Sequence, residues 1–157
     1  MPSLDRISFL IGSNEGFRGD VYRDTVGKRT VGIGFNVDDP AIARFIPSDV
    51  RLGQRSLTAL EAQAIFKNRI LPIATQDARS FMGEAAFNAL DPVRQSVLID
   101  MAYNLGGPRL GQFKKFRAAL EAGNFSEAAA ELLNSLYARQ VPNRAKRNAE
   151  MILKGGR

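Results

Sequence analysis

The fold is decided by residues 15–34, which read EGFRGDVYRDTVGKRTVGIG. The runs Val21–Tyr22 and Thr30–Phe35 are rich in β-branched and aromatic residues, a composition that favours strands. We therefore expect a small hairpin or a three-stranded sheet in this stretch. Gly32 and Gly34 fall within the second run, where glycine weakens a strand and more often marks the close approach of another part of the chain or of a ligand.

Helical patterns flank this stretch on both sides. Before it, apolar residues at helical spacing predict an amphipathic helix over residues 4–13, ending near Gly16. After Pro47 almost every segment has a helical pattern. The predicted helix starts are marked by cap residues and prolines: Thr58 with Glu61, Asp91 with Pro92, Asn124 with Glu127, and Pro142. Pro72 predicts a kink or break, and Gly106–Gly107 predicts the end of the helix that starts at Pro92.

These patterns predict one α+β domain, predominantly α, that spans the whole chain. The 157 residues fit a single globular domain, because domains commonly contain about 150 residues. We expect a small β-containing N-terminal lobe and a larger helical C-terminal lobe. The expected parts are a first helix at residues 1–13, a β-lobe at 14–57, a connecting helical region at 58–82 and a helical lobe at 83–157.

The composition limits the chemistry that this chain can perform. It contains neither cysteine nor histidine, which excludes disulfides, thiol nucleophiles, the usual zinc sites and catalysis by imidazole. It carries 22 Lys and Arg against 16 Asp and Glu, a net charge of +6 that favours a polyanionic partner. Nucleic acid, an anionic membrane and an acidic cell-wall polymer all fit this charge. No apolar run approaches the roughly 20 residues of a membrane-spanning helix, and residues 1–12 lack a secretory signal pattern, so we expect a soluble chain without stable membrane insertion.

The densest polar group follows the first predicted helix and contains Glu15, Asp20, Asp24 and Thr30. Two carboxylates that face each other across a cleft are the minimum for cleaving a glycosidic bond, one as acid and one acting on the opposite face of the sugar. Desolvation at a helix end would raise the pKa of Glu15, whereas a carboxylate on a solvated strand stays ionised. These arguments favour Glu15 as acid and Asp24 as base. The alternative is that such residues are caps or solvated surface groups, and a solvated turn carboxylate is the better interpretation of Asp20.

The same stretch resembles the active-site motif of glycoside hydrolase family 24, the phage-type lysozymes. The motif has Glu15, an Asp nine positions later, a Thr six positions further on, and then a Gly-x-Gly strand. Residues 91–106 are similar to the central buried helix of that family, and residues 142–147 are similar to its final helix. The resemblance implies a lysozyme-like fold and an endolysin-like muramidase. Such an enzyme hydrolyses the β-1,4 bond between N-acetylmuramic acid and N-acetylglucosamine in peptidoglycan, with host lysis as the result.

The resemblance also implies a role for each catalytic residue. Glu15 would be the general acid, Asp24 the general base, and Thr30 a hydroxyl that helps to hold the attacking water. The family inverts the anomeric centre, a geometry that requires carboxyl groups roughly 6.5 to 9.5 Å apart. Arg144 would support the site by tethering the Glu15 carboxylate through charge-assisted hydrogen bonds. The alternative for Arg144 is an ordinary basic side chain on an exposed helix.

Three further residues are candidates for substrate binding. Tyr103 and Asn104 stand where the family has an aromatic and an amide on the far wall of its cleft, and these groups suit an N-acetyl sugar. Tyr103 is also a plausible core aromatic. Asn36 follows the Gly-x-Gly strand and is placed to bond sugar or N-acetyl groups from the β-lobe. Phe35 departs from the family, much of which has histidine there, so apolar packing must replace any ion pair at this position.

Bacterial peptidoglycan is therefore the expected partner, for a monomeric enzyme that requires no metal and no cofactor. We expect it to reside in the host cytoplasm before release and to act on peptidoglycan in the periplasm or cell wall. Without a signal of its own, it would depend on a holin or another delivery path.

Three other interpretations fit the sequence less well. A non-catalytic peptidoglycan-binding module of the same fold has no need for all three motif residues. A nucleic-acid binder would explain the charge, but the chain has no aromatic-rich β platform, finger spacing or zipper heptads. A calcium site at residues 20–24 fails because Tyr22 stands where a ligand is needed.

Overall fold

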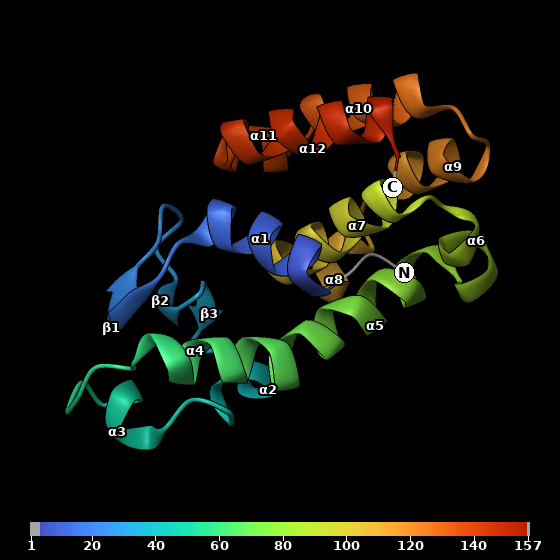
Figure 1. The fold of residues 1–157 in the computed structure, drawn as a ribbon. Helices are drawn as coiled ribbons and strands as arrows, with labels where there is room; N and C mark the ends of the chain where they lie inside the picture. The colour runs from blue at the N-terminus through green and yellow to red at the C-terminus, as the bar shows by residue number, and fades with distance from the viewer. Residues whose placement is uncertain (1–3, 157) are drawn as a thin grey trace. The chain divides into compact units, whose positions relative to one another are not determined.

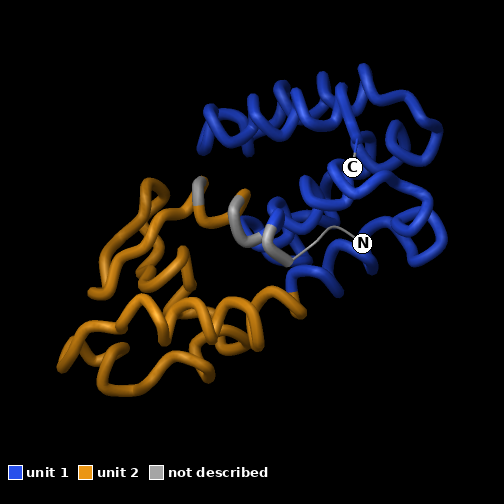
Figure 2. The backbone as a smooth tube through the Cα atoms, in the orientation of Figure 1, with its two compact units in different colours: residues 1–7, 74–157 blue, residues 8–73 orange. Residues whose placement is uncertain are grey.

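The structure is a computed structural model that describes residues 4–156, apart from the side chains of residues 4, 5, 8, 9 and 13. The chain forms two compact units, drawn in blue and orange in Figure 2. Unit 1 comprises residues 1–7 and 74–157, and unit 2 comprises residues 8–73. The boundary after residue 73 falls inside the region 58–82 that we expect to connect the two lobes.

The first helix, α1, runs over Leu4–Glu15 and confirms the predicted amphipathic helix. Its described apolar side chains are buried: Ile7, Leu10 and Ile11. Gly16 follows the helix with a φ of +68°, and its N–H donates to the carbonyl of Gly12 at 2.8 Å. Glycine adopts this left-handed conformation without steric cost, so the helix ends where the sequence indicates.

A three-stranded antiparallel sheet follows α1, with the order β1-β2-β3. Its strands are β1 at Arg18–Arg23, β2 at Arg29–Gly32 and β3 at Phe35–Asn36. This sheet confirms the expected hairpin or three-stranded sheet. Gly32 lies in a strand as expected, but Gly34 does not, because the chain reverses at residues 33 and 34. Gly32 and Gly34 have φ values of +70° and +73°, and two glycines in this region permit so tight a reversal.

Two short helices follow the sheet, α2 at Pro40–Ala43 and α3 at Ser48–Arg51. Helix α2 is not among the predicted elements, although Asp39 caps it by accepting a hydrogen bond from the N–H of Ala41 at 3.0 Å. An Asp-Pro pair therefore starts this helix, just as Asp91–Pro92 starts a later one.

An unbroken helical segment leads out of unit 2. It consists of α4 at Ala59–Ile65, a π-helical turn η1 at Phe66–Ile70 and α5 at Leu71–Met82. Thr58 and Glu61 form the predicted capping box, with both hydrogen bonds at 3.1 Å. Pro72 lies inside α5 without breaking the helix. Because proline has no N–H to donate, the wider π turn directly before it takes up the change in hydrogen bonding.

The rest of unit 1 is helical. Its elements are α6 at Glu84–Ala89, α7 at Pro92–Leu105, α8 at Gly107–Leu110, α9 at Lys114–Glu121, α10 at Phe125–Leu133, α11 at Leu136–Gln140 and α12 at Pro142–Lys154. Helix α10 packs against α9 and α12, and α12 also packs against α7 and α11 (Figure 1). The predicted starts at Asp91, Asn124 and Pro142 are confirmed, as is the end of α7 at Gly106.

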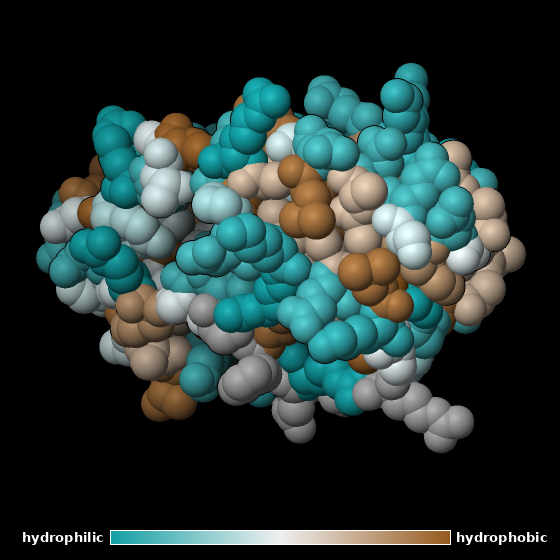
Figure 3. Space-filling model, turned by 90° about the horizontal axis from the view of Figure 1, so that it is seen from above, coloured by the Kyte–Doolittle hydropathy of each residue, from teal (hydrophilic) through white to brown (hydrophobic). Residues whose placement is uncertain are grey.

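Helix α7 is the most deeply buried element of unit 1, since every residue from 95 to 102 is buried. The predicted fold class, α+β and predominantly α, is confirmed by the helices and the small sheet. None of the helices within residues 4–156 is long and apolar enough to cross a bilayer. Hydrophilic residues predominate on the face drawn in Figure 3, where the strongly hydrophobic residues are scattered.

Candidate active site

Unit 2 contains the three residues that the motif predicts to be catalytic. Glu15 is the last residue of α1, Asp24 directly follows β1, and Thr30 lies in β2. The short connections from α1 through β1 to β2 hold these positions in one small substructure. The prediction of a polar group at the helix-sheet junction therefore agrees with the fold of this unit.

Glu15 packs against the reversal between β2 and β3. A Cβ atom added to Gly34 would lie 2.6 Å from Cδ of Glu15 and would also overlap its Oε2. The carboxyl group thus occupies the space that a side chain at residue 34 would fill. This contact explains why glycine is needed here, beyond its positive φ, and it confirms the expectation that a glycine marks a close approach.

Asp24 organises the turn between β1 and β2 with one of its two carboxylate oxygens. Oδ1 accepts hydrogen bonds from the N–H groups of Val26 at 3.0 Å and Lys28 at 2.8 Å. No residue within 4–156 donates a hydrogen bond to Oδ2 of this half-buried side chain. Two backbone amides therefore fix the carboxylate while its second oxygen stays available to accept a proton.

Thr30 is buried, with 4% of its surface exposed, and its Oγ1 donates to the carbonyl of Lys28 at 2.9 Å. A hydroxyl has one proton to donate and two lone pairs that accept. Because the Lys28 carbonyl takes the proton, the oxygen of Thr30 is left as an acceptor. It is therefore suited to receive a hydrogen bond from water.

Thr30 also stands at the centre of a polar row across the sheet. It pairs with Tyr22 in β1 and with Asn36 in β3. Directly paired residues of antiparallel strands point to the same face, with Cβ atoms about 4.5–5.5 Å apart. The predicted substrate residue Asn36 is half-buried, and its Oδ1 accepts from the N–H of Asp38 at 3.0 Å. Its amide nitrogen makes no hydrogen bond to a described residue and can donate to a sugar.

Tyr22 is a residue of this site that the sequence analysis did not select. Burial raises the pKa of its phenol, the negative charge of Glu15 raises it further, and Asp24 adds to the increase, whereas Arg18 lowers it. The phenol therefore lies within the electrostatic reach of both carboxylates. Its position two residues before Asp24 is a signal in the sequence, because residues two apart in extended chain point to the same face.

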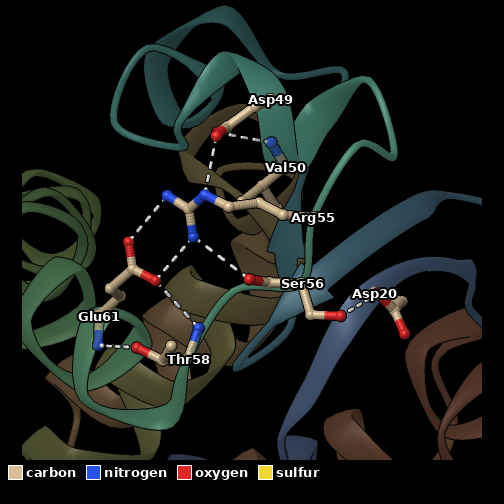
Figure 4. A network of polar contacts seen from close by, with 7 residues as sticks. All are labelled: Asp20, Asp49, Val50, Arg55, Ser56, Thr58 and Glu61. Carbon is tan, nitrogen blue, oxygen red and sulfur yellow. Dashed lines mark hydrogen bonds and ion pairs between the residues drawn. The ribbon is translucent and has the colours of Figure 1, made fainter.

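Asp20 lies outside this group. It is an exposed residue of β1 rather than of a turn, and its Oδ1 accepts a hydrogen bond from Oγ of Ser56 at 2.5 Å (Figure 4). The neighbouring Arg55 donates to Asp49 at 2.8 Å and to Glu61 at 2.9 Å. Asp20 thus helps to attach the segment before α4 to the sheet, which gives it a structural role.

The structure places Arg144 with a carboxylate that the sequence analysis missed. Nε and Nη2 of Arg144 donate to Oδ2 and Oδ1 of Asp100 at 3.0 and 2.8 Å. Nδ2 of Asn148 donates to the same carboxylate at 2.9 Å and to Oη of Tyr137 at 2.8 Å. Asp100 is fully buried and Arg144 is 8% exposed, so the alternative of an exposed basic residue is wrong. The predicted tether between Arg144, in unit 1, and Glu15, in unit 2, stays a prediction.

The signal for Asp100 is present in the sequence. It interrupts the run Val97–Ala102, which is otherwise apolar on all sides of the helix. A helix that is apolar all round is buried, and a carboxylate within it requires charged or polar partners. Only the fold identifies Arg144 and Asn148 as those partners, because they lie on a helix far away in the sequence.

The remaining predicted residues have defined positions but no tested role. Tyr103 and Asn104 lie half-buried near the end of α7 in unit 1, so their contact with substrate stays a prediction. Phe35 is buried, with 1% of its surface exposed, as expected for apolar packing in place of histidine. Within the described part of the chain, no group of three acidic side chains could hold a metal ion.

Unit 1 also has an open pocket of about 470 Å³ beside α9. The residues that line it include the aromatic Phe113 and Tyr137, three basic residues, Arg109, Lys114 and Lys115, and one acidic residue, Glu131. Such a surface combines apolar contact with positive charge. It therefore suits an acidic ligand with apolar parts.

Comparison with known proteins identifies the family. The phage lysozyme family matches residues 12–150. The probable T4-type lysozyme 1 of Dictyostelium discoideum is 27% identical over 97% of this chain and 96% of that protein, and its probable T4-type lysozyme 2 is 28% identical over 88% of each. The pre-baseplate central spike protein Gp5 of Enterobacteria phage T4 is 29% identical over 93% of this chain but over 27% of its own length. The family match spans the sheet with its three motif residues and most of the helical unit, and the chain therefore belongs to the phage lysozyme family and is a glycoside hydrolase, a lysozyme.

Proposed function

We propose that this lysozyme is an endolysin-like muramidase that cleaves the β-1,4 bond between N-acetylmuramic acid and N-acetylglucosamine with inversion. The observation that carries the proposal is the pairing of two acceptors in one unit. Asp24 has a carboxylate oxygen without a hydrogen bond from a described residue, and Thr30 has a hydroxyl whose proton is already donated to Lys28. Two such acceptors are what an attacking water requires, because it has two protons to donate.

The proposed reaction is a single displacement. Glu15 donates its proton to the glycosidic oxygen as the bond to the anomeric carbon breaks, and the water attacks that carbon from the opposite face. Asp24 takes one proton of the water, and the other remains directed at Thr30. The position of Glu15 at the C-terminal end of α1 supports its role, because the negative end of the helix dipole disfavours an ionised carboxylate there.

The biological role in this proposal is lysis of a bacterial host. A monomeric enzyme made in the host cytoplasm would reach the peptidoglycan of the periplasm or cell wall through a holin or another delivery path. The net charge of +6 and the excess of basic over acidic residues that line the pocket beside α9 support attraction to an acidic wall polymer. The likeness to the T4 spike protein, a baseplate component by its name, favours action from a virion as a second role.

Product analysis tests the bond and the stereochemistry. Purified peptidoglycan is digested and the new reducing ends are followed by NMR from the first minutes. We expect N-acetylmuramic acid ends that appear first as the α-anomer, because inversion of a β-linked sugar gives an α-product. Ends on N-acetylglucosamine would contradict the bond assignment, and an initial β-anomer would contradict inversion.

The Glu15→Gln variant tests the acid and separates an enzyme from a binding module. Glutamine preserves the size of the side chain but has no proton to donate, so we expect binding to insoluble peptidoglycan to persist while its digestion stops. Clearing of outer-membrane-permeabilised Gram-negative cells gives the readout. If wild type clears no cells under any pH or salt condition, the non-catalytic module is correct. A gel shift that weakens steeply with salt would support the nucleic-acid alternative.

A further inference from the structure

Tyr22 lies in the edge strand β1, next to the central Thr30 of the polar row. It is paired with Thr30 across the sheet, on the face that also carries Asn36, and it precedes Asp24, the first residue after β1, by two positions. The guanidinium carbon of Arg18 lies 4.2 Å from the centroid of the Tyr22 ring, a cation–π contact that holds the ring in place. The phenol is thus a fixed group beside both acceptors of the proposed water.

The hydroxyl of Tyr22 is available to a ligand. The side chain is half-buried, and its Oη makes no hydrogen bond to any residue within the described range. A partly buried phenol normally finds a hydrogen-bond partner. Burial and the nearby charges of Glu15 and Asp24 raise its pKa, so the group keeps its proton and remains a donor at neutral pH.

The attacking water can accept one hydrogen bond that neither Asp24 nor Thr30 supplies. Its two protons point to Asp24 and Thr30, and one lone pair must face the anomeric carbon. The second lone pair needs a donor, and a water held by three partners has a single position in space. Tyr22 and the amide nitrogen of Asn36 are the donors next to Thr30, and of the two Tyr22 lies nearer in sequence to Asp24 and feels its charge.

We propose that Tyr22 is a further catalytic residue, whose phenol O–H donates a hydrogen bond to the oxygen of the attacking water and fixes it between Asp24 and Thr30. The inference rests on the proposed inverting function. As the bond to the anomeric carbon forms, one proton of the water passes to Asp24, the other stays on the new hydroxyl, and Tyr22 keeps its own proton throughout. The phenol therefore orients the nucleophile without exchanging protons with it.

The test is steady-state digestion of purified soluble glycan strands by wild type and Tyr22→Phe. We expect kcat to fall about tenfold, the usual effect of one lost neutral hydrogen bond, with KM unchanged. The matched control is Val21→Ala, which removes packing from the same strand and should lower the melting temperature while leaving kcat unchanged. Circular dichroism at the assay temperature verifies folding. Tyr22→Leu, which also lacks the hydroxyl, replaces Tyr22→Phe if the latter is unfolded, and the same fall in kcat is expected.

The outcomes separate this proposal from the proposed function. If wild type releases no reducing ends, the muramidase function fails. If wild type is active and Tyr22→Phe matches its kcat, the inference about Tyr22 is overturned and the function stands. A raised KM with unchanged kcat would also overturn it, because the phenol would then contact the sugar. A loss of kcat in Asn36→Ala and not in Tyr22→Phe would assign the donor to Asn36 instead.

Discussion

Asp24 and Asp100 are the same residue type in two opposite environments. Asp24, in a turn of unit 2, uses one oxygen to accept two backbone hydrogen bonds and leaves the other open. Asp100, inside α7 of unit 1, is fully buried and accepts from Arg144 through both oxygens and from Asn148. A buried carboxylate with both oxygens engaged by a guanidinium and an amide is closed to a substrate, whereas Asp24 is oriented through one oxygen and can still react through the other. The comparison predicts that Asp24 serves chemistry and Asp100 serves stability.

Asp24→Asn should have the largest effect, and it should lower activity without lowering stability. The amide oxygen can still accept the turn hydrogen bonds, but the side chain can no longer take a proton from water. We expect kcat to fall roughly 10³-fold, within the range for loss of a general base, with an unchanged melting temperature. Release of reducing ends and thermal unfolding measure the two quantities. A stable variant with wild-type kcat would remove Asp24 from the mechanism.

Asp100→Ala should reverse this pattern and act on stability. It removes the carboxylate that pairs with the buried guanidinium of Arg144 and leaves a small cavity. Breaking one side of a buried ion pair costs about 3–5 kcal/mol of unfolding free energy, which urea denaturation would measure. Asp20→Ala is the control, because it removes an exposed carboxylate with one side-chain hydrogen bond. Equal losses in both variants would contradict the distinction between the two environments.

Gly34→Ala tests the close contact between residue 34 and the carboxyl group of Glu15. The added methyl group would overlap the Glu15 carboxyl, and alanine rarely adopts the φ of +73° found at this position. We expect a loss of about 1–2 kcal/mol in unfolding free energy, together with lower kcat as Glu15 is displaced. Gly27→Ala is the control for backbone strain, since its φ is +86° but a Cβ there would meet no atom within 4 Å. A variant at Gly34 that loses no more activity than the one at Gly27 would show that the contact does not position Glu15.

Tyr137→Phe should have a smaller effect, confined to the edge of the buried network. It removes the oxygen that accepts from Nδ2 of Asn148, while the bond from Asn148 to Asp100 remains. We expect a loss of about 1 kcal/mol, the usual value for one hydrogen bond between neutral groups. Urea denaturation of Tyr137→Phe and Asp100→Ala compares the loss of unfolding free energy in the two variants. A loss as large as that of Asp100→Ala would mean that the hydroxyl, rather than the ion pair, holds the network together.

Local signals account for what the sequence predicts correctly. The cap residues Thr58, Asp91 and Asn124 act within one helical turn, and the motif from Glu15 to Thr30 is carried on consecutive elements, so spacing alone indicates both. The reversal after Gly32 was not predicted, because residues 30–35 have the β-branched and aromatic composition of a continuous strand. The missed partners are those that depend on contacts distant in sequence. Asp100 meets Arg144 across 44 positions, and no local pattern specifies which cation a buried carboxylate will meet.

Glu61 is a third carboxylate, which accepts hydrogen bonds through both oxygens like Asp100 but is only half-buried like Asp24, and its substitution should have the smallest effect. Hydrogen bonding to Arg55 and to the N–H of Thr58 lowers the pKa of Glu61 to about 2 from an ordinary value of 4.5. A lowered pKa in the folded state means that the contribution to stability is fully present above pH 4.5 and is lost as the pH falls toward about 2. The difference in melting temperature between wild type and Glu61→Gln should therefore be small and constant above pH 5 and should shrink below it. It is small because solvent screens the pair of Arg55 and Glu61. If the difference in melting temperature instead grows as the pH falls, the ion pair of Arg55 and Glu61 destabilises the fold. Hydrogen bonds to both oxygens of a carboxylate would then stabilise the protein only where the carboxylate is buried, as at Asp100.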